Sequence, residues 1–122
     1  MQYGSLQNLV VWQKAMDLAK HTYQILREFP SEERYGLIDQ IRRCAISVPS
    51  NIAEGYGRMS DNEFLRFLAI ANGSLYELET QILLTSEILP NLSEKCDALL
   101  KEITEEKKII RSFIPTIKNR IR

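Results

Sequence analysis

The sequence holds few of the residues that build metal, redox or disulfide sites. It has one histidine and two cysteines in 122 residues, and no Cys/His pair has the spacing of zinc ligands. A di-iron bundle would need two Glu-x-x-His pairs on facing helices, and His21 belongs to no such pair. We therefore expect no metal and no cofactor. Cys44 and Cys96 are expected to be buried, reduced thiols rather than a disulfide or a reactive site.

Long apolar runs and a net charge are also lacking. Apolar runs such as Leu9–Trp12 are far shorter than the roughly 20 residues of a membrane span, and residues 1–5 lack the basic start of a signal peptide. These absences predict a cytoplasmic protein without membrane contact. The 16 Lys+Arg residues balance 16 Asp+Glu residues, so the basic excess typical of nucleic-acid-binding domains is missing.

Glycine and proline are sparse, and they separate segments with apolar residues three and four positions apart, which predicts helices. The first helix is expected over residues 8–29, with Ser5 or Asn8 as its N-cap. A second is expected from about residue 31 to residues 55–57, with a kink near Pro49 favoured over a break. The apolar stripes predicted for the two helices are Trp12, Met16, Ala19, Tyr23 and Leu26, and Ile41, Ala45, Val48 and Ile52.

Two further helices complete the predicted fold. Ser60 and Glu63 form a capping-box sequence at the start of the third, which is expected to stop at Pro90. The fourth is expected to begin near Ser93, with its last turns bent by Pro115. Short connections favour an all-α, up-down-up-down antiparallel four-helix bundle in one domain, residues 1–122. The predicted stripes are Phe64, Leu68, Ala71, Leu75, Leu78, Ile82 and Leu89, and Leu99, Ile103, Ile110, Ile114, Ile117 and Ile121.

The third helix has a second apolar face beside its core stripe. On a helical wheel this face contains Leu65, Ala69, Tyr76 and Leu83. A helix in a lone bundle needs one apolar arc, so the second arc favours contact with another subunit in a homo-oligomer. The alternative is that these side chains only cover the edges of the bundle.

A narrow polar stripe follows the second helix. Gln40, Ser47, Asn51 and Glu54 point nearly the same way. We favour a hydrogen-bonded network at a helix or subunit interface. The alternative is an open groove in which an enzyme would act on a small molecule or nucleic acid. No paired acid and base and no nucleophile–base spacing is visible, so we predict no catalytic residues.

The zero net charge conceals uneven segments. Residues 60–106 contain three Lys/Arg and ten Asp/Glu, whereas residues 107–122 contain six Lys/Arg and no acid. Within the second segment, Lys107, Arg111, Lys118 and Arg122 share a narrow arc of the helix. Two interpretations remain open. The arc either contacts nucleic-acid phosphates or pairs with the acidic segment of the same or a neighbouring chain.

Four segments carry a resemblance to a known family. They are residues 8–15 (NLVVWQKA), 35–55 (YGLIDQIRRCAISVPSNIAEG), 63–71 (EFLRFLAIA) and 73–81 (GSLYELETQ), together with Phe29-Pro30. The chain resembles the four-helix bundle proteins encoded in intervening sequences of bacterial 23S rRNA genes. The resemblance implies a ring-shaped homopentamer from a family without an established biochemical activity. Its characteristic small and polar positions correspond here to Gln40, Arg43, Ser47, Asn51, Glu54, Gly55, Ser74 and Glu77.

The chain is also similar to the accessory protein of diversity-generating retroelements. That relative is a basic pentameric barrel that binds a reverse transcriptase and nucleic acid, whereas the present chain has balanced charge. Taken together, the sequence predicts a non-catalytic homo-oligomeric scaffold that presents a surface to RNA or to a ribonucleoprotein partner. An enzyme using the polar stripe of the second helix is the alternative.

Overall fold

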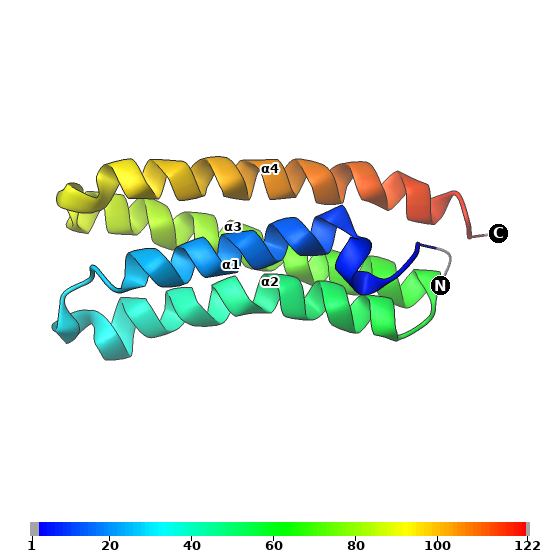
Figure 1. The fold of residues 1–122 in the computed structure, drawn as a ribbon, viewed down its shortest axis with the longest axis horizontal. Helices are drawn as coiled ribbons and strands as arrows, with labels where there is room; N and C mark the ends of the chain where they lie inside the picture. Colours follow the sequence, from blue (N-terminus) through cyan, green and yellow to red (C-terminus); the bar gives the residue numbers. More distant parts are fainter. Residues whose placement is uncertain (1–2, 122) are drawn as a thin grey trace.

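Four long helices make up the described chain. The structure is a computed structural model that describes residues 3–121 and, within them, all side chains except those of Arg34 and Tyr35. The helices are α1 (Val10–Leu26), α2 (Asp39–Gly57), α3 (Asp61–Ile88) and α4 (Ser93–Lys118). Successive helices run in opposite directions (Figure 1). Residues 3–121 contain no β-strand, and the predicted all-α four-helix bundle is confirmed.

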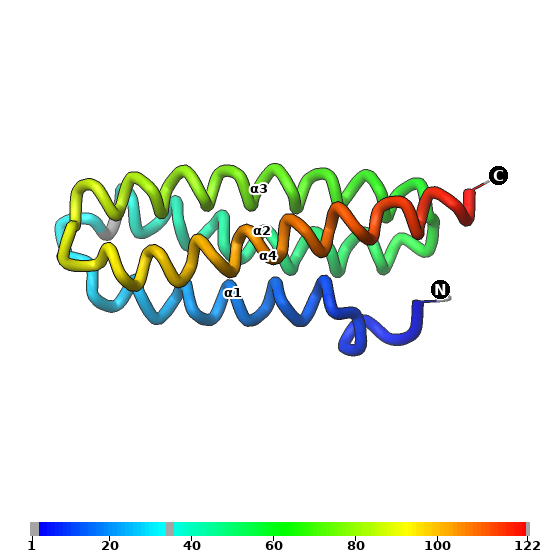
Figure 2. The backbone as a smooth tube through the Cα atoms, turned by 90° about the horizontal axis from the view of Figure 1, so that it is seen from above, coloured from blue at the N-terminus to red at the C-terminus, as the bar shows by residue number. Residues whose placement is uncertain are grey.

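The four helices form a square in cross-section. Each helix packs against the two that precede and follow it in the cycle α1, α2, α3, α4. Figure 2 places α1 and α3 on opposite edges of the bundle. The helices α1 and α3 therefore run in the same direction at diagonal corners, and the α1/α2 and α3/α4 edges face opposite ways.

The start of α1 differs from the prediction. A short 3-10 helix, Leu6–Asn8, precedes it, and Leu9 occupies the N-cap position without a side-chain hydrogen bond. Ser5 and Asn8 were both wrong as caps, because the chain makes this additional turn before α1 begins. The helix also ends earlier than predicted, at Leu26, and a turn leads to Pro30.

The entry into α2 is irregular. A 3-10 turn (Ser31–Glu33) and a π-helical turn (Arg34–Ile38) precede the regular helix. From Asp39 the helix continues through the buried Pro49 to Gly57 as one element. The predicted continuation past Pro49 is thus correct, and the alternative of two separate pieces is not what the chain adopts.

The boundaries of α3 and α4 agree with the sequence. The Ser60 hydroxyl accepts a hydrogen bond from the Glu63 backbone N–H at 3.4 Å, as half of the predicted capping box. The Glu63 carboxylate instead accepts from the Arg66 guanidinium at 2.8 Å. Pro90 opens a short turn that ends α3, and α4 continues past Pro115 to Lys118.

All four helices contribute to the core, and the core residues predicted for three of them are correct. The predicted stripe of α2 is fully buried, and so is that of α3 apart from Leu89 at its end. In the stripe predicted for the fourth helix, Ile114 and Ile121 are half-buried and the other residues are buried, although Ile121 lies beyond the end of α4. In α1 the predicted stripe is right for Leu26 but wrong for Met16 and Tyr23, which are 41% and 39% exposed. The core face of α1 consists of Val11, Ala15, Leu18, Thr22, Ile25 and Leu26.

Both cysteines are free and buried, as predicted. Burial raises the pKa of the Cys44 and Cys96 thiols above their usual range, which keeps the thiols protonated and weakly nucleophilic. None of the helices described within residues 3–121 combines the length and apolarity needed to cross a membrane.

Candidate functional site

A row of polar side chains follows the line where α2 packs against α3. The Ser47 and Ser74 hydroxyls are hydrogen-bonded at 2.7 Å. Asn51 donates from Nδ2 to the Ser47 backbone oxygen at 2.8 Å and to its Oγ at 2.9 Å. These three residues satisfy one another across the helix pair, so this part of the row is the predicted interface network.

The same row continues along the helix pair through Cys44. Its thiol donates to Glu77 Oε2 at 3.5 Å and accepts from Gln81 Nε2 at 3.3 Å. Glu77 raises the thiol pKa in addition to burial. The network therefore joins two helices through contacts up to 37 residues apart in sequence. Gln81 is a member that the sequence did not suggest, since its position becomes informative only when α2 and α3 are paired.

The remaining predicted stripe residues lie outside this network. Gln40 is exposed. Arg43 and Glu54 are also exposed, and they pair within α2 with Asp39 at 3.2 Å and with Arg58 at 2.7 Å. The predicted stripe thus divides into an interhelical centre and a solvent-facing margin. Its centre consists of hydroxyl, amide, thiol and carboxylate groups that are hydrogen-bonded to each other.

The basic arc of α4 contains one buried cation and two exposed ones among the described residues. Lys107 is 8% exposed, its Nζ is 2.7 Å from Glu79 Oε1, and it lies 3.8 Å from the Tyr76 ring centre. These contacts remove Lys107 from the surface available to phosphates. Arg111 and Lys118 are exposed, and Arg122 lies outside the described residues. The acidic α3 of the same chain therefore neutralises one cation of the arc, as the second of the two interpretations predicts for that residue.

The second apolar face of α3 lies at the surface. We call Leu65, Ala69, Tyr76 and Leu83 the α3 ridge. Tyr76 is 49% exposed and Leu83 is 51% exposed, while Ala69 is exposed and Leu65 is half-buried. Lys107 covers one side of Tyr76, which places the ridge at the α3/α4 edge of the bundle.

The residues of α1 that were predicted to face the core form a second apolar surface, on the α1/α2 edge of the bundle. Trp12, Met16, Ala19 and Tyr23 line a groove of about 650 Å³ with Ile46, Pro49 and Ala53 of α2. We call this surface the α1/α2 groove. The polar Gln24 and Ser50 also line it, and Lys20 and Arg27 are the charged residues along it. The sequence signal was present, because these residues share one helix face, but the face was assigned to the core.

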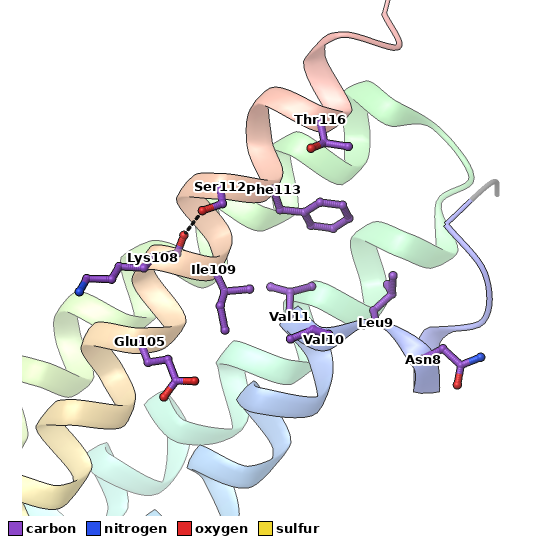
Figure 3. Close-up of a pocket in the computed structure, with 10 residues that line it drawn as sticks. All are labelled: Asn8, Leu9, Val10, Val11, Glu105, Lys108, Ile109, Ser112, Phe113 and Thr116. Atoms are coloured by element: carbon purple, nitrogen blue, oxygen red, sulfur yellow. Dashed lines mark hydrogen bonds between the residues drawn. The ribbon is translucent and has the colours of Figure 1, made fainter.

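A smaller cleft of about 470 Å³ lies between the start of α1 and the C-terminal half of α4. In Figure 3, Ile109 and Phe113 extend from α4 toward Val11, whereas Lys108 extends away from the cleft. The cleft exists because α1 begins at Val10 and leaves this part of α4 uncovered. No group of three or more His, Cys, Asp or Glu side chains suited to a metal occurs among the described residues.

The fold and these surfaces define a small antiparallel four-helix bundle with apolar side chains on two opposite edges. The 23S rRNA-intervening sequence protein family matches residues 7–112, and the chain belongs to that family. A crystal structure from the S23 ribosomal protein family of Bacteroides thetaiotaomicron, a protein of unknown function, has the same fold with a TM-score of 0.79. It is 24% identical, over 86% of this chain and 98% of that chain. No curated protein matches the chain.

Proposed function

We propose that the protein is a non-catalytic scaffold that assembles with copies of itself and presents a basic surface to RNA or a ribonucleoprotein partner. The observation that carries the assembly is the α3 ridge, because a folded monomer gains nothing by exposing Tyr76 and Leu83 on one helix face. A ring of five copies is the assembly that the family resemblance implies. Free Cys44 and Cys96 suit the reducing cytoplasm.

Light scattering on dilute protein tests the assembly. A particle mass that is a multiple of the 14.2 kDa chain is the expected result. A monomer at all concentrations would overturn the proposal, since both apolar edges would then have no partner.

The RNA surface is supported by cations without ion-pair partners. Lys108, Arg111 and Lys118 are exposed on the C-terminal half of α4, and none has an acidic neighbour within salt-bridge distance among the described side chains. By contrast, Arg120 pairs with Asp61 at 3.5 Å. Exposed cations with no partner are the groups that neutralise backbone phosphates.

Binding to a single-stranded RNA in titrations at several salt concentrations tests this surface. We expect Arg111→Ala and Lys118→Ala each to weaken binding and to reduce the slope of log K against log salt by about 0.7. Lys101→Ala removes the same charge from the other half of α4 and is the matched control. If RNA does not bind at low salt, the partner is the protein component of a ribonucleoprotein. If Lys101→Ala weakens binding equally, α4 is not the contact surface.

A further inference from the structure

The two apolar edges of the bundle differ, because one of them forms a groove and the other is the exposed face of a single helix. Met16, Tyr23 and Ile46 in the α1/α2 groove are 41%, 39% and 44% exposed, and the groove has a volume of about 650 Å³. On the opposite edge, Tyr76 and Leu83 project from the single helix face of the α3 ridge. A helix face that enters a groove between two helices is a common way to bury apolar surface.

We propose that the α1/α2 groove binds the α3 ridge of a second copy of this chain. This inference rests on the self-assembly proposed above and specifies the surfaces that meet. Because groove and ridge lie on opposite edges of one chain, the contact is head-to-tail, and every copy uses both surfaces with different neighbours. Head-to-tail contacts form a ring when the rotation between successive copies closes, and an open filament when it does not.

The positions of the side chains along the bundle support this pairing. The helices α1 and α3 run in the same direction and end, at Leu26 and Ile88, at the same end of the bundle (Figure 1). Rotation about an axis parallel to the bundle keeps each residue at its height. Tyr76 lies about 18 Å before the end of α3 at about 1.5 Å per residue. The same distance along α1 falls between Trp12 and Met16.

Leu83 gives the same result. It lies about 7.5 Å before the end of α3, and that height on α1 falls between Ala19 and Tyr23, which line the groove. The two projecting side chains of the ridge therefore lie level with apolar residues that line the groove. No shift along the bundle is needed to bring the surfaces together.

The charges are complementary at the end of this contact. Lys20 and Arg27 lie along the groove. Glu87 lies one residue before the end of α3 and is exposed. With the helix ends aligned, Glu87 lies about 1.5 Å before the end of α3 and Arg27 about 1.5 Å beyond the end of α1. This offset of about 3 Å leaves the two long side chains within reach of each other. No ion pair engages any of these three side chains within the part of the chain that the structure describes, so all of them are available to a neighbouring copy.

Two glutamate substitutions test the pairing through particle mass by light scattering. Met16→Glu places a charge in the groove, and Leu83→Glu places one on the ridge. We expect each variant alone to be a monomer of 14.2 kDa, because either change blocks one surface that every copy needs. An equimolar mixture should form a complex of two chains and no larger particle, since the intact groove of one variant accepts the intact ridge of the other.

Leu84→Glu is the matched control. Leu84 is 47% exposed, close to the 51% of Leu83, but it lies about 100° around α3. This variant should keep the wild-type mass, and circular dichroism should show that all three variants are folded. A second pair of changes avoids the apolar surfaces altogether. Arg27→Glu and Glu87→Lys should each weaken assembly tenfold or more, and the two changes in one chain should restore it.

The outcomes separate this inference from the proposed assembly. If the wild-type chain is itself a monomer, the self-assembly fails. If the wild-type chain assembles and Met16→Glu does not reduce its mass, the assembly stands and the groove is not the contact surface. If the two glutamate variants fail to pair when mixed, or if the charge exchange does not restore assembly, the head-to-tail contact is wrong.

Discussion

One carboxylic acid in the centre of the bundle has no partner. Glu106 is fully buried, and neither of its side-chain oxygens has a hydrogen-bond partner. Burial, together with a smaller effect of the nearby Glu105, raises its pKa to about 9. The side chain is therefore protonated in the folded protein at neutral pH. In the unfolded chain it ionises near its ordinary value of 4.5.

This difference makes the stability depend on pH. Because the folded-state pKa is raised, the contribution of Glu106 is most favourable below pH 4.5 and is lost as the pH rises toward 9. We predict that Glu106→Met, which has no ionisable group, stabilises the fold by about 2 kcal/mol or more at pH 8 and by less at pH 5. Urea unfolding at both pH values measures the effect.

Glu106→Gln is the control for charge alone. It should flatten the pH dependence as Glu106→Met does, but with a smaller gain because a buried polar amide remains. Equal pH slopes for the wild-type chain and both variants would show that Glu106 does not titrate between the folded and unfolded states.

Lys107 shows the opposite arrangement for a neighbouring charge. Its ammonium group contacts the Glu79 carboxylate and the face of the Tyr76 ring, so an ion pair and a cation–π contact compensate the buried charge. The sequence placed Lys107 in a basic arc with Arg111, Lys118 and Arg122. Which members of that arc face α3 is determined by the angle at which α4 packs, and a helical wheel of α4 alone does not contain that angle.

At the scale of elements, Gly55 marks a close approach of α2 to α3. A Cβ added at this glycine would lie 2.6 Å from the Cβ of Phe67 and 3.2 Å from Cδ1 of Phe64. The Phe67 Cβ is fixed to the backbone and cannot rotate away. The glycine therefore sets the distance between the two helices whose polar network is centred on Ser47 and Ser74.

We predict that Gly55→Ala destabilises the protein by about 1–3 kcal/mol, because the helices must separate to admit the methyl group. Gly73→Ala is the matched control, since no atom lies within 4 Å of the added Cβ in α3. That substitution should raise stability by about 0.5–1 kcal/mol. Thermal unfolding of both variants measures the difference, and a loss of stability in both would contradict the explanation.

The error in α1 has a physical explanation. On a helical wheel of α1, the face with the larger side chains is assigned to the core. That face contains Trp12, Met16 and Tyr23, whereas the other contains the small residues Ala15 and Thr22. In the structure the smaller residues face inward. The Thr22 hydroxyl donates to the Leu18 carbonyl oxygen at 2.7 Å, which makes its burial possible. The sequence pattern shows that α1 has two apolar faces, but it does not show which face packs in the core and which faces solvent or a partner.

For the whole molecule, assembly should appear in the thermal stability. If copies dock through groove and ridge, association stabilises the folded state by mass action. We predict that the melting temperature of the wild-type chain rises with protein concentration. The Met16→Glu variant should melt at a temperature independent of concentration. Calorimetry over a hundredfold concentration range checks this, and a concentration-independent wild-type melting temperature would argue against assembly.

Repetitive patterns in the sequence determined the fold class, three of the four core stripes, the Ser60 cap and the starting point of α4. These features depend on residues within a few turns of one another, so local spacing contains them. The sequence also predicted a hydrogen-bonded network of the polar side chains of α2 at an interface. Ser47 bonds across that interface to Ser74, and Asn51 bonds to Ser47 within α2.

Only the tertiary structure decided which apolar face of α1 turns inward, which cations of α4 pair with α3, and where the unpartnered Glu106 lies. These outcomes depend on the rotation of each helix about its axis, which is set by the packing of all four helices at once. The same rotations place the groove and the ridge on opposite edges, because α1 and α3 occupy diagonal corners of the bundle (Figure 2).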